Sequence, residues 1–337
     1  MEKVFALDAV EKRKLSFLYH HSGIDTRYSV LPDYSLPPAQ WQFYPAAESL
    51  EPFPGIRQRM EVFRRQAPAL SLQAIRQCLD QAGMDKKDIT HLITVSCTGM
   101  SAPGLELELM ELLDLPRWTN RSCIHFMGCY AAIHGLKQAD AICRAEPGAR
   151  VLLVCTELCT LHFQKIPSPD NITSSLLFGD GSAAVLLQAA SGKGRAIRGF
   201  YAEVQPAGKS DMSWEIGETG FAMSLSGYVP ELIQADFRPF MERALQRYGA
   251  GAGDIKGWCI HPGGKRILEA VADSLGIARE ELQPAFEVLR EYGNMSSPTV
   301  LFVLKKMLKR NMAGPLLLAA FGPGLTMETC CLEAAPV

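Results

Sequence analysis

The sequence contains no stretch of 18 uninterrupted apolar residues, which is about the length that a membrane-spanning helix requires. It also lacks an excess of positive charge, because its 34 lysines and arginines are balanced by 36 acidic residues. The resulting formal charge of −2 gives no overall basic field that would attract nucleic acid or an anionic membrane. The N-terminal sequence MEKVFALDAVEKRK has no apolar segment of the kind found in signal peptides. These absences predict a cytoplasmic protein with no membrane span and no nucleic-acid partner.

None of the ten cysteines forms a Cys-x-x-Cys pair, so a structural zinc site is not expected. Cys330 and Cys331 are adjacent, and Cys97, Cys155 and Cys259 lie in apolar runs typical of buried strands. This usage does not suit a disulfide framework. It predicts free thiols in a reducing compartment.

Apolar segments typical of strands alternate with segments of helical periodicity along most of the 337 residues. This alternation predicts parallel βαβ units and sheets covered by helices on both faces, which is an α/β fold. A second round of alternation predicts two related halves, 1–200 and 201–337. We expect strands at 91–97, 150–155, 182–187, 257–260, 315–320 and 325–332, and helices at 56–82, 105–113, 129–145, 230–248, 265–275 and 297–309.

Cys129 is the cysteine whose surroundings most favour chemistry. It follows Gly128 and opens a helical segment of small residues, CYAAIHG. A glycine permits a sharp turn from strand to helix that would present the sulfur to a pocket. The positive end of the helix dipole would then lower the pKa of the thiol. A buried structural cysteine remains the alternative.

Two further residues complete a possible thioester site. His261 ends an apolar strand and precedes Pro-Gly-Gly, and Asn294 lies in the turn EYGNMSS ahead of a helix. Asn294 can be a simple turn residue, or its amide can donate a hydrogen bond to an oxyanion beside the histidine. A thiolate, an imidazole that keeps it ionised and two oxyanion donors suit acyl transfer from thioesters. These residues alone are equally compatible with a cysteine hydrolase.

Several segments, in the same order, resemble the type III polyketide synthases, the chalcone and stilbene synthase family of the thiolase superfamily. The resemblance runs from about Arg27 to the C-terminus, and it is most specific in GNMSSPTVLFVL and FGPG. It implies a thiolase-like fold of two related halves, with mixed sheets layered between helices in the order αβαβα. The other matching segments are FMGCYAAIHGLKQA, VLLVCTELCTLHF, LFGDGSAAVLL and WCIHPGGKRILEAV, while SVLPDYS and TELCTLHF are similar to bacterial members.

The resemblance also implies roles for individual residues. Cys129 would carry the growing acyl chain, and His261 and Asn294 would stabilise oxyanions and promote malonyl decarboxylation. His162 is bulkier than the residue common in plant members, which argues against a flavonoid-type product. The remaining implied positions are the gatekeepers Phe178 and Met223, the cavity-wall residues Thr98, His162 and Ser296, and Ala102, which would enter the partner's cavity in a homodimer.

Two departures from the family pattern concern the acyl donor and the N-terminus. The basic residues that bind coenzyme A phosphates fall near Lys14, Phe17 and His21, so two of the three are replaced, and Gly264 is the other expected tunnel residue. The donor is therefore expected to be either a CoA thioester or an acyl carrier protein. The family's first core strand has no counterpart, and the loss of a central strand would expose apolar surface and unpaired ladder groups.

The implied activity is that of an acyltransferase that needs no metal or redox cofactor. It would load an acyl starter on Cys129, extend it with malonyl-CoA and release a pyrone or resorcinol. One alternative is a single-round 3-ketoacyl synthase or acyltransferase on the same scaffold. Another is a non-catalytic partner subunit that has kept the fold.

Overall fold

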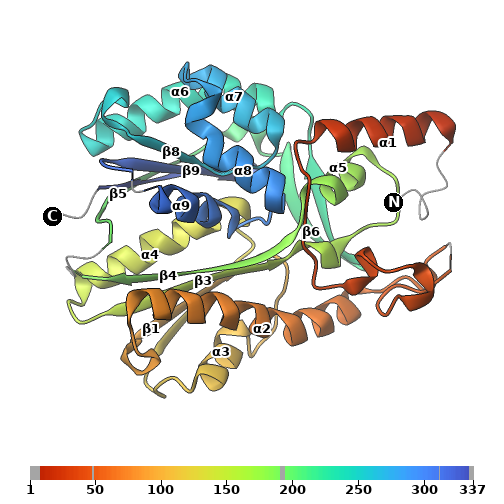
Figure 1. Cartoon of the computed structure of the whole chain (residues 1–337), viewed down its shortest axis with the longest axis horizontal. Coiled ribbons are helices and arrows are strands. Elements are labelled where there is room, and N and C mark those ends of the chain that lie inside the picture. Colours follow the sequence, from red (N-terminus) through yellow and green to blue (C-terminus); the bar gives the residue numbers. More distant parts are fainter. Residues whose placement is uncertain (1–7, 48, 190–193, 311, 334–337) are drawn as a thin grey trace.

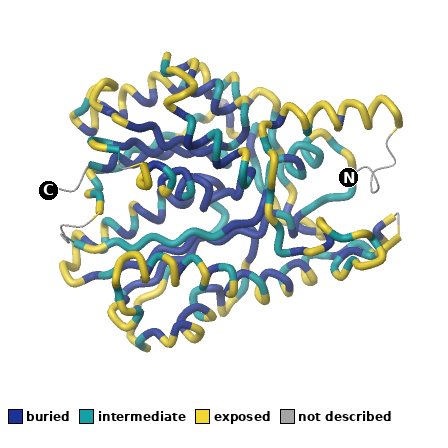
Figure 2. The backbone as a smooth tube through the Cα atoms, viewed as in Figure 1, coloured by how far each residue is buried: buried dark blue, intermediate teal, exposed yellow. Residues whose placement is uncertain are grey.

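The computed structural model describes residues 8–47, 49–189, 194–310 and 312–333. Its helices and strands stack in five layers, in which two sheets alternate with three layers of helices (Figure 1). The expected αβαβα arrangement is therefore confirmed. Figure 2 shows that the strands and the middle helices are largely buried, whereas the outer helices expose one face to solvent.

The first sheet has the strand order β2-β1-β3-β4, in which β4 alone runs antiparallel to its neighbour. All six residues of β1 are buried, as is usual for a central strand with a parallel neighbour on each side. Helices α2 and α3 cover the outer face of this sheet (Figure 1). Their bounds are α2 (Ile56–Ala82), β1 (His91–Ser96), α3 (Leu105–Leu113), β2 (Asn120–His125), β3 (Arg150–Leu158) and β4 (Asp180–Gln188).

The second sheet has the order β5-β10-β9-β8, with antiparallel β5, β10 and β9 and a parallel pair of β9 and β8. Helices α6, α7 and α8 cover its outer face (Figure 1). The first sheet ends at Gln188 and the second begins at Ile197. The bounds are β5 (Ile197–Val204), α6 (Val229–Tyr248), β8 (Gly257–Ile260), α7 (Lys265–Leu275), α8 (Gln283–Tyr292), β9 (Leu316–Gly322) and β10 (Thr326–Leu332).

Two helices form the middle layer, α4 (Ala131–Ala145) and α9 (Thr299–Lys309), and each begins close to a candidate site residue. Each packs against strands of both sheets. Because the two sheets enclose α4 from both sides, this helix consists largely of small and apolar residues. The N-terminal ends of these two helices bring the turns before them, which hold Cys129 and Asn294, to the same region between the sheets.

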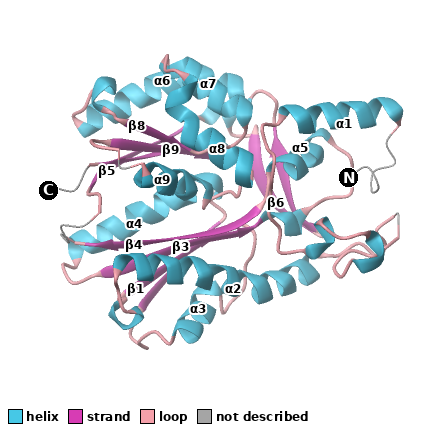
Figure 3. Ribbon diagram, viewed as in Figure 1, coloured by secondary structure: helices cyan, strands magenta, loops and turns pink. Residues whose placement is uncertain are grey.

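Several elements were not expected from the sequence. They include a hairpin made of β6 (Met212–Gly217) and β7 (Gly220–Leu225), which forms a separate two-stranded sheet between the stacked sheets and α5 (Pro169–Leu177) (Figure 3). The others are α1 (Ala9–His21), α5, α8 and the strands β2 and β5. The sequence of β2 (NRSCIH) is mostly polar, so it lacks the apolar run that would mark a strand.

The expectation that a missing strand would open the middle of the first sheet is wrong. β1 pairs directly with β3 over five residue pairs, so the interior of the sheet is continuous. Within the described residues, β4 is an edge strand whose outer side has no partner. The unpaired ladder groups therefore lie at this edge. Residues 1–7, for which no strand was expected, lie outside the described residues.

None of the described helices is both long and apolar enough to cross a membrane. Across the same residues, no group of three or more His, Cys, Asp or Glu side chains is arranged to hold a metal ion. All ten cysteines are free, and Cys155 and Cys259 are fully buried in their strands.

Candidate active site

A cavity lies beside the β6–β7 hairpin and is lined by residues from both sheet regions. It brings together Cys129, His261 and Asn294, which come from three separate parts of the chain. The other predicted residues that line it are Thr98, His162, Phe178, Met223 and Ser296.

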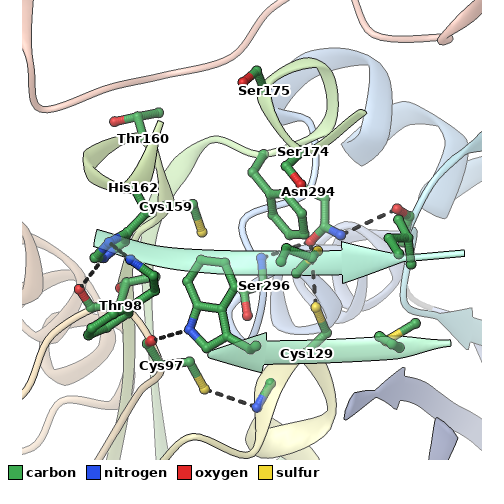
Figure 4. Close-up of a pocket in the computed structure, with 18 of the residues that line it drawn as sticks. Cys97, Thr98, Cys129, Cys159, Thr160, His162, Ser174, Ser175, Asn294 and Ser296 are labelled. Atoms are coloured by element: carbon green, nitrogen blue, oxygen red, sulfur yellow. Dashed lines mark hydrogen bonds between the residues drawn. The ribbon is translucent and has the colours of Figure 1, made fainter. Parts of the chain in front are cut away.

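Cys129 lies in a short 3₁₀ turn (Gly128–Tyr130) that leads from β2 into α4. Gly128 has φ +77°, and a Cβ atom there would lie 2.2 Å from Cδ of Pro323, so only glycine fits this turn. The backbone N–H of Gly128 also donates to Sγ of Cys97 over 2.9 Å. These constraints fix the direction in which the Cys129 side chain enters the cavity, where it points toward Asn294 (Figure 4).

The prediction that the helix terminus lowers the pKa of Cys129 is wrong. Burial raises the pKa of this thiol to about 11, and the negative charge of Glu157 adds to the shift. Hydrogen bonds from Ser296 and Asn294 oppose it only in part. The thiol is 8% exposed, so desolvation of the thiolate outweighs the helix dipole, which acts through a few partial charges.

His261 is 1% exposed, and neither of its ring nitrogens has a hydrogen-bond partner among the described residues. Burial lowers the pKa of His261 to about 3, so the ring is neutral near pH 7. Before a substrate binds, a neutral ring does not keep Cys129 ionised, which differs from the expectation drawn from the sequence. A neutral imidazole with unsatisfied nitrogens can instead accept the thiol proton or donate to a bound carbonyl oxygen.

Hydrogen bonds fix both the backbone and the side chain of Asn294. Its N–H donates to Leu177 O and its carbonyl accepts from Gly179 N, each over 2.9 Å. Its Oδ1 accepts the N–H of Ser296 over 2.8 Å and lies 4.0 Å from Sγ of Cys129. Its Nδ2 donates to Gly263 O over a long 3.3 Å, so this donor can turn to a ligand at little cost.

Two residues with a left-handed backbone flank the site, Phe126 with φ +57° and Ser296 with φ +59°. Non-glycine residues avoid this region at a cost of about 1–3 kcal/mol. Phe126 lies in the turn that presents Cys129, and Ser296 follows Asn294 by two residues. Strain at turns that present functional side chains is common where the surrounding structure maintains a site's geometry.

A buried acidic side chain, Glu157, lies next to the last residue of β3 and is close enough to Cys129 for its charge to act on the thiol. Its Oε1 accepts from Ser297 Oγ over 2.7 Å, and its Oε2 accepts from Cys97 N and Thr98 Oγ1, each over 2.8 Å. Glu157 therefore ties the end of β1 to the turn before α9. Burial raises its pKa to about 7 despite these hydrogen bonds.

This shift predicts a pH-dependent stability that Glu157→Gln should remove. A carboxyl whose folded pKa is raised from 4.5 to about 7 contributes its stabilisation fully below pH 4.5 and loses it as the pH rises through 7. The wild type should therefore lose up to about 3 kcal/mol relative to Glu157→Gln between pH 5 and 8. Urea unfolding of both proteins across this range measures the difference, and a constant difference would contradict the account.

One wall of the cavity is locked by His162. Its Nε2–H donates to Thr98 O over 2.7 Å, and its Nδ1 accepts the N–H of Phe221 over 3.0 Å. Its ring stacks on Phe221 with centroids 4.2 Å apart. Burial lowers the pKa of His162 to about 3, so the neutral form that these bonds require persists. The predicted wall residue thus also fixes the hairpin to the first sheet.

Trp214 on β6 is a cavity residue that the sequence analysis missed. Its Nε1–H donates to Cys97 O over 2.7 Å, and its ring meets His162 and Phe221 edge-on. Cys97, Cys159, Thr160 and Arg27 also line the cavity without having been predicted. Cys159 and Thr160 come directly after β3, which ends at Leu158, and this position at the end of a strand is the signal that could have identified them.

The other predicted residues lie outside the cavity lining. Ala102 is exposed in the loop before α3, and Lys14 and His21 are exposed on α1. Gly264 is buried at the start of α7, next to the lining residue Gly263.

Comparison with family models gives two matches that together span nearly the whole chain. Residues 5–191 match the N-terminal domain of chalcone and stilbene synthases, and residues 199–336 match the C-terminal domain of the same family.

Two relatives are similar along almost the entire chain. "Probable polyketide synthase 1" of Dictyostelium discoideum is 31% identical over 98% of this chain, which spans only 10% of that protein. "Type III polyketide synthase A" of Arabidopsis thaliana is 32% identical over 95% of this chain and 83% of its own length.

Solved structures of similar proteins share the fold closely. PKS-I from the brown alga Ectocarpus siliculosus aligns with a TM-score of 0.92 at 30% identity, covering 98% of this chain and 91% of its own. The 1,3,6,8-tetrahydroxynaphthalene synthase of Streptomyces coelicolor A3(2) aligns with a TM-score of 0.89 at 26% identity, covering 100% and 93%.

Proposed function

Because this chain belongs to the chalcone and stilbene synthase family of type III polyketide synthases, we propose that Cys129, His261 and Asn294 are its catalytic residues. Cys129 takes an acyl starter from a thioester and holds it while malonyl units are added. The observation that carries this proposal is the convergence of a thiol, an unpartnered imidazole and an amide on one buried cavity. We place the nucleophile in the half 1–200 and the other two residues in the half 201–337.

The loading step follows from the protonation states of the site. The neutral thiol of Cys129 attacks the thioester carbonyl while its proton moves to His261, and the proton then passes to the departing thiolate. His261 and Asn294 donate hydrogen bonds to the carbonyl oxygen as it becomes negative. The same donors stabilise the enolate that forms when malonyl-CoA loses carbon dioxide. The enolate carbon attacks the acyl group on Cys129 and the C–S bond breaks, so the lengthened chain leaves on the donor thioester. The Cys129 thiolate that is released takes up a proton from solvent, which regenerates the thiol.

The proposal needs no metal or redox cofactor, since every step is a proton transfer, an acyl transfer or a decarboxylation. The substrates are malonyl-CoA and an acyl starter on CoA or on a carrier protein, in the cytoplasm. Repeated extension and ring closure would give a pyrone or a resorcinol.

We also propose that the enzyme is a homodimer in which Ala102 reaches the partner's cavity. Two observations support this assembly. Ala102 is exposed and does not line the cavity of its own chain. The outer edge of β2 has no partner among the described residues, and its Asn120, Arg121 and Cys123 are exposed.

Product length separates this function from a single-round ketoacyl synthase. The purified protein is incubated with a panel of acyl thioesters and malonyl-CoA, and the products are analysed by mass spectrometry. Several added two-carbon units per starter are expected. A product with one added unit would favour the single-round enzyme. A folded protein that binds acyl thioesters without forming any product would favour the non-catalytic subunit.

Trp214→Ala is expected to lengthen the product. The indole lines the cavity and is anchored to Cys97 O, so its removal enlarges the space for the growing chain. We expect the product distribution to shift by at least one malonyl unit, with acylation of Cys129 retained. The exposed Trp118→Ala is the matched control, because Trp118 is 63% exposed and lies outside the cavity. Identical product lengths in the wild type and Trp214→Ala would contradict this role.

A further inference from the structure

Helix α5 presents polar side chains to the cavity on the face where a buried helix usually carries apolar ones. Four residues of this helix and its C-terminal end line the cavity at the spacing i, i+3, i+4 and i+7, namely Asn171, Ser174, Ser175 and Phe178. A helix that packs against a core normally has apolar residues at this spacing. Three of the four are polar here, so this face of α5 suits a ligand that carries hydrogen-bonding groups.

The hydroxyl group of Ser174 is the unsatisfied member of this face. Its Oγ atom is buried and has no hydrogen-bond partner among the described residues. Asn171, one turn earlier on the same face, donates its Nδ2 to Ile166 O over 2.9 Å. Because a buried hydroxyl without a partner destabilises a protein, such groups are uncommon and call for an explanation. A ligand that accepts a hydrogen bond from Ser174 would supply the missing partner.

Several other donors of the cavity wall are already engaged within the protein. Thr98 and Thr160 donate their hydroxyl groups to buried acidic side chains. His162 and Trp214 donate their ring N–H groups to backbone carbonyls. These residues shape the wall, but their donors are occupied. Ser174 differs from them, because its donor remains available to a ligand.

Ser174 lies close to the residues that hold the reacting group. Its backbone carbonyl accepts the N–H of Phe178 over 3.0 Å, and Phe178 forms a parallel β-bridge with Asn294. Figure 4 shows the side chains of Ser174 and Asn294 near each other on the same side of the cavity. An acyl chain on Cys129 with its thioester oxygen at Asn294 would therefore have its next carbons near Ser174.

The chemistry of chain growth offers a partner for this hydroxyl. Each malonyl extension adds two carbons and one carbonyl oxygen, and a ketone oxygen accepts hydrogen bonds without donating any. A saturated starter has no such oxygen beyond its thioester carbonyl. The hydroxyl of Ser174 would thus stay unpaired while a saturated starter is on Cys129, and it would become paired once the chain carries a 3-oxo group.

We propose that Ser174 determines chain specificity by donating a hydrogen bond to the 3-oxo oxygen of the extended chain on Cys129. This contact favours second and later extensions over release after the first. The inference rests on the proposed function and adds to it a residue that recognises the intermediate. No bond to Ser174 forms or breaks during the reaction.

The test compares octanoyl-CoA and 3-oxooctanoyl-CoA as starters, each with malonyl-CoA. Ser174→Ala should lower kcat/KM for 3-oxooctanoyl-CoA about tenfold, the effect of about 1.4 kcal/mol of lost hydrogen bonding. The value for octanoyl-CoA should stay within about twofold of the wild type, since that chain offers no 3-oxo oxygen. With octanoyl-CoA, the share of products that carry two or more added units should fall.

Two further variants separate the hydroxyl from a general effect on α5. Ser174→Thr keeps a hydroxyl at the same position and should restore most of the preference for 3-oxooctanoyl-CoA. Thr173→Val removes a hydroxyl from the next residue of the same helix with almost no change in shape. Thr173 does not line the cavity, so this control should behave as the wild type with both starters.

Each outcome separates the role of Ser174 from the chemistry at Cys129. If the wild type loads neither thioester onto Cys129, as measured by intact-protein mass, the proposed function itself fails. If both load but Ser174→Ala slows both equally, or slows neither, only the role of Ser174 is overturned. A rise in the KM for malonyl-CoA that is the same with both starters would assign the hydroxyl to the arm of the donor and would also overturn it.

Discussion

Cys129→Ala is expected to abolish both acylation of the protein and polyketide formation. The variant removes the sulfur that lies 4.0 Å from Asn294 Oδ1 in the cavity that also holds His261. The alanine that replaces Cys129 has no nucleophile with which to form the thioester. The loss should reach the detection limit of a product assay by mass spectrometry, while circular dichroism confirms that the variant is folded.

Cys159 provides the sharpest comparison, because it is a second buried cysteine that lines the same cavity. Burial raises its pKa well above the usual value, and among the described residues no side chain hydrogen-bonds to its thiol in the way that Asn294 contacts Cys129. Cys159→Ala should therefore still become acylated. Full polyketide formation by Cys129→Ala, with loss in Cys159→Ala, would transfer the role of nucleophile to Cys159.

Asn294→Ala is expected to slow decarboxylation of malonyl-CoA by about 10²–10³-fold, the usual cost of removing one oxyanion donor. Oδ1 of Asn294 is occupied by the N–H of Ser296, so Nδ2 is the side that can donate to the enolate oxygen. Release of carbon dioxide from malonyl-CoA measures this step directly. Acylation of Cys129 should be affected much less, because His261 remains as a donor to the starter carbonyl.

Asn294→Asp tests the same donor with almost no change in shape. The carboxylate can still accept the N–H of Ser296 but has no hydrogen to donate, so decarboxylation should fall as it does in Asn294→Ala. Asn171→Ala is a control at another asparagine of the cavity lining, on α5, and should retain decarboxylation. Wild-type rates of decarboxylation in Asn294→Asp would contradict the role of Nδ2.

The three central residues could be predicted because local sequence marks them. Gly128 before Cys129, Pro-Gly-Gly after His261 and the turn around Asn294 all stand where strands or turns meet helices. The structure brings Cys129 and Asn294 together because the middle helices α4 and α9 begin at the same region between the sheets, and His261 reaches the same cavity from the end of β8. Their ionisation could not be predicted, since the pKa of Cys129 depends on burial by segments far away in the sequence.

The hairpin that carries Trp214 could not be predicted for a different reason. Its strands are six residues long, mostly half-buried or exposed, and they pair only with each other. Short strands of this kind have no continuous apolar run and no clear alternation. Trp214 reaches the cavity only because His162 and Cys97, which are remote in the sequence, fix the hairpin against the first sheet.

Peptide mapping of the acylated protein tests the central claim most directly. The protein is mixed with acyl thioesters on CoA and on a carrier protein, digested, and analysed by tandem mass spectrometry to locate the added mass. The account predicts one acyl group on the peptide that contains Cys129, and none when malonyl-CoA is added afterwards to release the chain as product. An acyl group on a different residue, with Cys129 unmodified while product still forms, would contradict it.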